Sequence, residues 1–232
     1  MAAGLGSRFG SYTELIPKGF VEIGGKPMVI RSIEILLACG IERIVIGTGY
    51  KQEAFESLKN EYPQIETCFS PRYAETNSMY TLYNTREIIG ENSFLLLESD
   101  LVFEKKAIDS LLTCDAPDVM LITPVTKFQD QYYVECDENH ILTTCSVNRD
   151  ELDAKGELVG LHKLSNDFYK MMCTDYSRIV NDQPKLGYEY ELVRMSQSIS
   201  PVYILKVDGL KWYEIDDEAD LAYAEKNIIE YC

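Results

Sequence analysis

The first residues of the chain have types and spacing that suit phosphate binding. They read AAGLGSR, in which Gly4 and Gly6 permit positive φ angles and successive backbone N–H groups can form an anion-binding concavity. Arg8 adds a planar guanidinium that matches phosphate oxygens. A GxG turn taken alone is equally typical of a simple tight turn, so this interpretation depends on partners elsewhere in the chain.

A lysine follows the glycine-rich segment closely. Lys18 stands directly after Pro17 in the segment PKGFVEIGGKP. A lone lysine is most often a solvated surface residue. Beside Arg8, however, it would give a second cation in an otherwise acidic chain, and a triphosphate needs such cations.

Two aspartates come directly after apolar segments. Asp100 ends SFLLLESD and Asp216 ends KWYEID. Either aspartate could be a turn or cap residue. Mg²⁺ takes one or two carboxylates together with substrate phosphate oxygens. We therefore expect Asp100 and Asp216 to bind the metal, and Asp217 to cap the last helix.

Strands and helices alternate along the chain and would position these residues. Continuous apolar runs such as 93–100 are typical of strands that are buried on both faces. Alternation up to residue 125, followed by a more antiparallel part, predicts one domain over 1–232 with a mixed sheet and a parallel core. Ligands bind beyond the C-terminal ends of such parallel strands. Helices are expected at 28–40, 51–62, 77–89, 165–180 and 217–231.

Composition excludes several classes of function. The chain has 232 residues, 46% of them hydrophobic, and a formal net charge of -16, which disfavours binding to nucleic acid or an anionic membrane. Neither a membrane-spanning apolar stretch nor an export signal is recognisable. The seven cysteines form no CxxC pair and only two histidines are present, so we expect free thiols in the cytoplasm and no zinc site.

Four segments, taken in chain order, resemble the nucleotidyltransferases with a glycosyltransferase-A-like fold: AAGLGSR, PKGFVEIGGKPM, LLLESD and EID. Other segments, among them SFLLLESDLVF, RDELDAKGELVG and GYEYELV, look most similar to the 2-aminoethylphosphonate cytidylyltransferases, which are related to the phosphocholine cytidylyltransferases. The resemblance covers essentially the whole chain. It implies a Rossmann-like α/β fold with a mixed, mostly parallel sheet flanked by helices.

The resemblance also implies roles for residues at matching positions. Arg8 and Lys18 would be the catalytic cations, and Asp100 and Asp216 would hold Mg²⁺. The remaining CTP contacts would come from Ala3, Gly4, Gly6, Ser7, Thr48, Gly49, Tyr50, Asn77 and Ser78.

The acceptor side of the expected site is less well defined by the sequence. By resemblance, Glu157 and Gly160 would lie near the acceptor. Relatives commonly carry a lysine where this chain has Val147 and Asn148, and Lys127 could compensate for it. A primary amine would be held by carboxylates and a phenol, whereas a trimethylammonium prefers an aromatic cage. Glu189 is the favoured amine partner among the candidates, which are Asp130, Tyr132, Tyr133, Tyr188, Glu189, Tyr190, Glu191, Trp212 and Tyr213.

The expected reaction is transfer of CMP from CTP to a small phosphonate, with 2-aminoethylphosphonate favoured and pyrophosphate released. The partners are then small molecules, and a homodimer is compatible with the sequence. A phosphocholine or sugar-1-phosphate acceptor and an inactive nucleotide-binding module stay open as alternatives.

The glycine-rich turn has almost no sequence before it. In the fold that the resemblance implies, a short apolar strand runs into this turn near the middle of the sheet. Met1 stands at the last place of that strand, so we expect the first strand to be truncated. The sheet should then show a gap or a segment that fills it.

Overall fold

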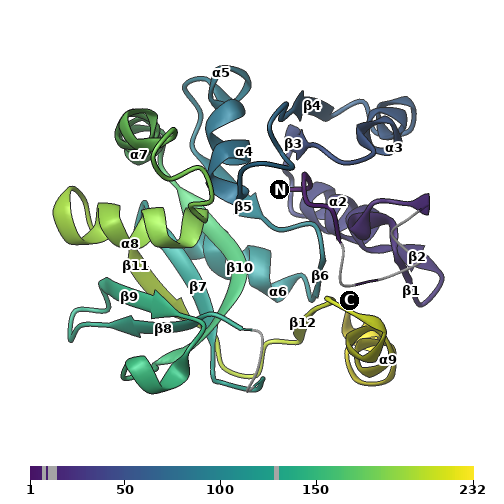
Figure 1. Cartoon of the computed structure of the whole chain (residues 1–232). Coiled ribbons are helices and arrows are strands. Elements are labelled where there is room, and N and C mark those ends of the chain that lie inside the picture. Colours follow the sequence, from purple (N-terminus) through teal and green to yellow (C-terminus); the bar gives the residue numbers. More distant parts are fainter. Residues whose placement is uncertain (7–8, 10–14, 128–130) are drawn as a thin grey trace.

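The computed structural model describes residues 1–6, 9, 15–127 and 131–232. Its strands form a mixed sheet with smaller two-stranded units beside it (Figure 1). The strands are β1 (Glu22–Ile23), β2 (Lys26–Pro27), β3 (Ile44–Thr48), β4 (Ile65–Phe69), β5 (Phe94–Leu97), β6 (Leu101–Phe103), β7 (Val119–Thr123), β8 (Tyr133–Cys136), β9 (Leu142–Ser146), β10 (Gly156–Leu164), β11 (Tyr203–Lys206) and β12 (Trp212–Glu214).

The largest sheet has the order β11-β7-β10-β8-β9, and β5 also pairs with β10. The pairs β11–β7 and β3–β4 are parallel, whereas β10 runs antiparallel to β5, β7 and β8. The antiparallel hairpin of β8 and β9 has the expected position. The predicted α/β class with a mixed sheet is confirmed. Parallel pairing is less extensive than expected, because β11–β7 and β3–β4 are the only parallel pairs among the described strands.

Helices cover both faces of the sheet (Figure 1). The α-helices are α2 (Met28–Ala38), α3 (Gln52–Ser57), α4 (Ser78–Asn84), α5 (Arg86–Ile89), α6 (Lys106–Thr113), α7 (Asn166–Ile179), α8 (Tyr188–Ser198) and α9 (Glu218–Asn227). The 3₁₀ helices are η2 (Lys18–Phe20), η3 (Leu58–Asn60), η4 (Arg149–Glu151) and η5 (Ile229–Tyr231). Each expected helix is found, although 77–89 divides into α4 and α5 at Thr85.

Strand β7 shows why both faces are covered. Every residue from Val119 to Thr123 is buried. Because side chains alternate along a strand, Val119 and Leu121 join the core cluster with α2 and α6, and Met120 and Ile122 join the cluster with α4, α7 and α8. A continuous apolar run is therefore required here.

The sheet is open between β3 and β5, in agreement with the expected gap. These two strands do not pair with each other. Met1 and Ala2 join only their ends, because the Met1 ammonium donates to Leu97 O at 2.6 Å and Ala2 N donates to Gly47 O at 2.8 Å. Beside them lies a groove of about 410 Å³ between the two strands and α2.

Candidate active site

A pocket of about 480 Å³ lies where the N-terminal loop meets the ends of β5 and β12. Ala3, Gly4 and Gly6 line it, as the sequence predicts for a phosphate-binding loop. Gly6 has a φ of +63°, a conformation that favours glycine. Ser7 and Arg8, the other expected members of the loop, lie outside the described residues.

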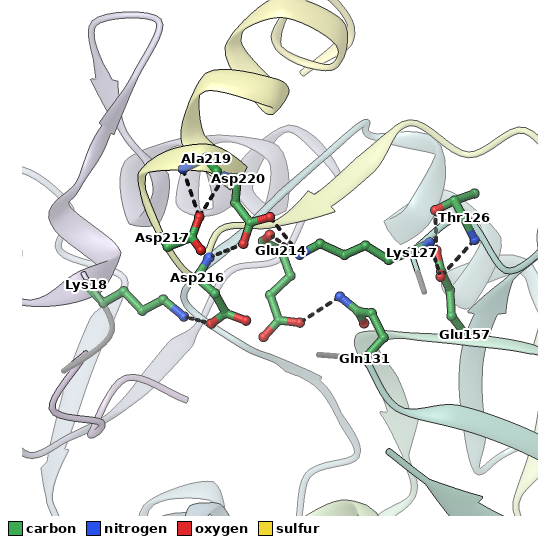
Figure 2. Close-up of polar contacts among 10 residues, drawn as sticks. All are labelled: Lys18, Thr126, Lys127, Gln131, Glu157, Glu214, Asp216, Asp217, Ala219 and Asp220. Carbon is green, nitrogen blue, oxygen red and sulfur yellow. Dashed lines mark hydrogen bonds and ion pairs between the residues drawn. The ribbon is translucent and has the colours of Figure 1, made fainter. Parts of the chain in front are cut away.

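Lys18 and the two expected metal ligands meet on the wall of this pocket. The Lys18 Nζ donates to Asp100 Oδ2 at 2.6 Å and to Asp216 Oδ1 at 2.5 Å; the contact with Asp216 is drawn in Figure 2. All three side chains are largely buried. The sequence therefore identified three residues that the tertiary structure joins.

The pairing of two short strands brings the aspartates together. Asp100 precedes β6 and Asp216 follows β12, and these strands pair antiparallel with Glu214 opposite Leu101. Ile215 N also donates to Asp100 O at 3.0 Å, which continues the ladder to the aspartates. The position of Asp216 thus depends on a long-range strand pair.

The backbone around Lys18 directs its side chain into the pocket. Pro17 has an extended backbone and begins the turn of η2. A Cβ on Gly19 would lie 3.1 Å from Ser99 O, so a glycine allows this turn to approach the end of β5 closely. Lys18 therefore reaches Asp100 from a neighbouring backbone segment.

The charges of Lys18, Asp100 and Asp216 stabilise one another. Burial disfavours the Lys18 ammonium, but the two carboxylates outweigh burial, so the pKa of Lys18 is raised above its ordinary value. The lysine thus stays charged at neutral pH. Its ammonium occupies a position between two carboxylates, and oxygen ligands of this kind suit Mg²⁺.

Asp217, next to the second aspartate, has a different role. Its Oδ1 accepts hydrogen bonds from Ala219 N at 2.8 Å and Asp220 N at 2.9 Å, which makes it the N-cap of α9 (Figure 2). These contacts support the expected capping role of Asp217.

Residues expected near the nucleoside divide into two groups. Asn77 and Ser78 line the pocket at the start of α4, where Asn77 is the N-cap. Thr48, Gly49 and Tyr50 lie behind the N-terminal loop: Tyr50 N donates to Ala3 O at 3.3 Å. A Cβ on Gly49 would lie 2.6 Å from Ala3 O, so this glycine lets the loop pack closely. The second group thus supports the loop from behind.

The expected acceptor residues also divide. Gly160 and Glu189 line the pocket, whereas Lys127 and Glu157 are not among its described lining residues. The buried Glu157 carboxylate accepts from Thr126 N at 2.9 Å and Lys127 N at 3.0 Å (Figure 2). Glu157 therefore holds the segment that carries Lys127.

Lys127 lies beside the proposed metal ligands, but its ammonium pairs with Asp220. Its Nζ is 3.0 Å from Asp220 Oδ1, 3.3 Å from Glu214 O and 4.5 Å from the centre of the Tyr213 ring. These contacts join the 126–127 segment to the start of α9 (Figure 2). Asp130, another candidate, lies outside the described residues.

Sequence reasoning missed two glutamates of the pocket, Glu98 and Glu214. One carboxylate oxygen from each, with one from Asp100, lies within 4.8 Å of the other two. Both glutamates stand two residues before a proposed metal ligand, as Glu-Ser-Asp and Glu-Ile-Asp. Because residues two apart in extended chain share a face, this repeated E-x-D pattern was the available signal.

Comparison with known proteins identifies the family of this chain. The MobA-like NTP transferase domain matches residues 1–167. The chain belongs to the MobA-like NTP transferase family. The N-terminal loop, Lys18 and Asp100 all lie inside the matched region, whereas Asp216 lies beyond it.

Curated relatives of this NTP transferase include cytidylyltransferases. It is 32% identical over 108 residues to 2-aminoethylphosphonate cytidylyltransferase from Lancefieldella rimae, a match to 47% of this chain and 44% of that protein. It is 36% identical over 104 residues to choline-phosphate cytidylyltransferase from Streptococcus pneumoniae, covering 45% and 44%. The chain thus spans less than half the length of these two relatives.

Solved structures confirm the fold of this NTP transferase. The CTP:phosphocholine cytidylyltransferase from Streptococcus pneumoniae superposes with a TM-score of 0.80 at 22% identity, over 97% of this chain and 95% of the other. The inositol-1-phosphate CTP transferase from T. maritima gives 0.82 at 18% identity, over 97% and 94%. Within the described residues, no helix has the length and apolar character needed to cross a membrane.

Proposed function

We propose that this protein is an Mg²⁺-dependent cytidylyltransferase that transfers CMP from CTP to a small phosphonate, with 2-aminoethylphosphonate as the favoured acceptor. One observation carries the proposal: Lys18 joins Asp100 and Asp216 on the wall of a pocket that the glycine-rich loop also lines. Membership of the NTP transferase family and the similarity to cytidylyltransferases support it.

In the proposed reaction, a phosphonate oxygen attacks the α-phosphorus of CTP and forms a new P–O bond. The bond from that phosphorus to the β-phosphate oxygen breaks, and pyrophosphate leaves with its electron pair. Such a displacement needs positioning and charge neutralisation more than a protein nucleophile. The site therefore needs cations around the phosphates rather than a serine or cysteine nucleophile.

Three parts of the chain would supply this environment. The backbone N–H groups of the 3–6 loop would cradle the phosphates, and Arg8 would neutralise the departing pyrophosphate. The ammonium of Lys18 would move from the two aspartates to the charge that builds at the α-phosphorus. Asp100 and Asp216 would hold Mg²⁺, which supplies further charge neutralisation when bound.

Glu189 supports a cationic acceptor at the same pocket. It lines the cavity and is only 6% exposed. A buried carboxylate is strongly disfavoured without a cationic or hydrogen-bonding partner. The carboxylate of Glu189 has a backbone hydrogen bond at its own residue, but it forms no ion pair within the described residues. An ammonium on the acceptor would balance its charge, which favours 2-aminoethylphosphonate over a sugar phosphate. The reducing cytoplasm is the compartment consistent with free cysteines.

The test is a pyrophosphate-release screen with Mg²⁺. Each of the four ribonucleoside triphosphates is combined with 2-aminoethylphosphonate, phosphocholine or glucose-1-phosphate. The proposal expects the fastest release with CTP and 2-aminoethylphosphonate. Faster release with another acceptor would contradict the acceptor assignment. CTP binding in calorimetry without pyrophosphate release from any acceptor would instead indicate an inactive nucleotide-binding module.

A further inference from the structure

The described lining of the pocket is rich in carboxylates. It contains five carboxylates, two lysines and Met1, whose ammonium interacts with Glu98 and Asp100, although the pocket must accept anionic phosphates under the proposed function. Lys18 already pairs with Asp100 and Asp216. The three remaining acids are glutamates: Glu98, Glu189 and Glu214.

Glu189 forms no ion pair with any cation among the described residues. It lies in the first turn of α8 and is only 6% exposed. Its carboxylate folds back over the helix start, since a Cβ on Gly187 would lie 2.3 Å from Glu189 Oε2. A buried carboxylate on a pocket wall is then available to a cationic group of a ligand.

Glu98 is oriented by a chain of buried polar side chains. The Tyr188 hydroxyl donates to Glu98 Oε1 at 2.8 Å, and the same hydroxyl lies 3.1 Å from His162 Nε2. Tyr188 and His162 are fully buried and neither lines the pocket. Because a hydroxyl has one proton to give, the His162 Nε2–H would donate to Tyr188. Burial lowers the pKa of His162 to about 3, so the imidazole stays neutral.

Gly160 provides the space for the Glu98 carboxylate. Its φ is +79°, and a Cβ there would lie 2.6 Å from Glu98 Oε2. The register of β10 against β7 shifts between Leu158 and His162, so the irregular backbone at Gly160 lies next to Glu98. The orientation of the Glu98 carboxylate therefore depends on Gly160 and His162 of β10 and on Tyr188 of α8.

We propose that Glu98, positioned by Tyr188 and His162, forms with Glu189 a subsite that selects an acceptor with a primary ammonium group. Carboxylates can accept hydrogen bonds from its three N–H donors, whereas a trimethylammonium has no N–H to give. A neutral terminus would leave Glu189 without a cationic partner and would give Glu98 no hydrogen bond beyond the one from Tyr188. This inference rests on the proposed function and specifies the acceptor class of that site.

The test compares two acceptors of nearly equal shape, 2-aminoethylphosphonate and propylphosphonate, in which a methyl group replaces the ammonium. The wild-type protein should prefer the amine by at least ~10-fold in kcat/KM, because a site built for hydrogen bonds rejects an analogue that lacks them. E98Q, E189Q and Y188F should lose most of this preference through a higher KM for the amine. The readout is the ratio of kcat/KM for the two acceptors, which a loss of rate common to both acceptors does not change.

E191Q is the matched control. Glu191 is a fully buried glutamate on the same helix, two residues after Glu189, and is not among the lining residues of the pocket. It should keep the wild-type preference. Thermal melts of each variant separate loss of fold from loss of selectivity, and the Tyr188→Phe change retains the buried ring.

The outcomes distinguish failure of the subsite from failure of the function. If CMP is transferred but E98Q and Y188F slow both acceptors equally, the subsite is wrong and the function stands. Preference for phosphocholine in the wild-type protein would also overturn the subsite. If no acceptor reacts, the proposed function fails, and calorimetry with the two phosphonates then tests the subsite. Tighter binding of 2-aminoethylphosphonate than of propylphosphonate, with the difference lost in E98Q, supports the subsite. Equal binding of the two phosphonates overturns it.

Discussion

The Lys18 ammonium lies 2.5 Å from Asp216 Oδ1, although the two residues are separated by 198 positions in the chain. The same nitrogen lies 2.6 Å from Asp100 Oδ2. A cation of the protein thus holds the two carboxylates that are proposed to bind Mg²⁺. Metal and lysine would compete for these oxygens until the phosphates of the nucleotide offer Lys18 another partner.

Replacing Lys18 by methionine should therefore strengthen metal binding while turnover falls. We expect K18M to bind Mn²⁺ roughly 10-fold more tightly than wild type without nucleotide, equal to about 1.4 kcal/mol. Electron paramagnetic resonance of free Mn²⁺ measures this affinity. K127M is the control, since Lys127 is a nearby lysine that pairs with Asp220 instead. An equal gain in Mn²⁺ affinity in K127M would mean that the loss of one positive charge near the pocket, rather than the contact of Lys18 with the two aspartates, was responsible.

Neighbouring substitutions at 216 and 217 should separate catalysis from capping. D216N removes a proposed metal ligand and should lower turnover at least ~100-fold, in the range of losses when transition-state charge stabilisation is removed. D217A removes the N-cap of α9 and should lower the free energy of unfolding by about 1 kcal/mol with turnover nearly retained. Steady-state kinetics and urea denaturation test both. Full activity in D216N would contradict the metal assignment.

Arg8 lies outside the described residues and is tested by activity. If its guanidinium neutralises the departing pyrophosphate, R8A should lower kcat about 100- to 1,000-fold, as removal of an oxyanion donor does. R8K should recover only part of this loss, since an ammonium cannot reproduce the planar fork. Single-turnover kinetics give the comparison. An unchanged rate in R8A would remove Arg8 from the mechanism.

Replacing Gly160 by alanine should lower the free energy of unfolding for two reasons. Replacing Gly40 by alanine should lower it for only one of them. Gly160 and Gly40 have φ angles of +79° and +80°, but only at Gly160 would a Cβ meet a neighbour, the Glu98 carboxylate. Each change should cost about 1–2 kcal/mol for the left-handed backbone. G160A should cost a further ~1–3 kcal/mol for crowding and should also reduce selectivity for the amine. Equal losses in urea denaturation would show that Glu98 moves aside freely.

Glu191 should make stability depend on pH. Burial, opposed by Arg194 and reinforced by Asp175, raises the pKa of Glu191 to about 7. The folded protein then keeps a proton that the unfolded chain loses near its ordinary pKa, so the unfolding free energy falls as pH rises from about 4.5 to 7. E191Q should match wild type at pH 5 and exceed it by ~2–3 kcal/mol at pH 8. Parallel urea curves at both pH values measure this, and an unchanged difference would contradict it.

Much of the local structure follows from neighbouring residues in the sequence. The buried run Val119–Thr123 forms a strand, and Asn77, Ser165 and Asp217 cap the helices that follow them. Each signal acts over a few residues, because caps and side-chain alternation depend on the nearest backbone groups. Lys18, Asp100 and Asp216 could likewise be selected by type and by their position after a turn or strand.

The tertiary structure decided how these segments meet. Glu157 was expected beside the acceptor, yet its carboxylate accepts the Thr126 and Lys127 amides, a contact across about thirty residues. The Tyr188 hydroxyl that donates to Glu98 likewise comes from α8, 90 residues away. No local pattern encodes such pairs, since they depend on which strands and helices pack together.

The sequence by itself determined the residue types of the site and the class of fold, because burial and turn formation are written in short patterns. Only the tertiary structure decided that β6 pairs with β12 and thereby joins Asp100, Asp216 and Lys18 in one pocket. Strand pairing is set by the shape and burial of the whole core. Distant carboxylates therefore became one site only through folding.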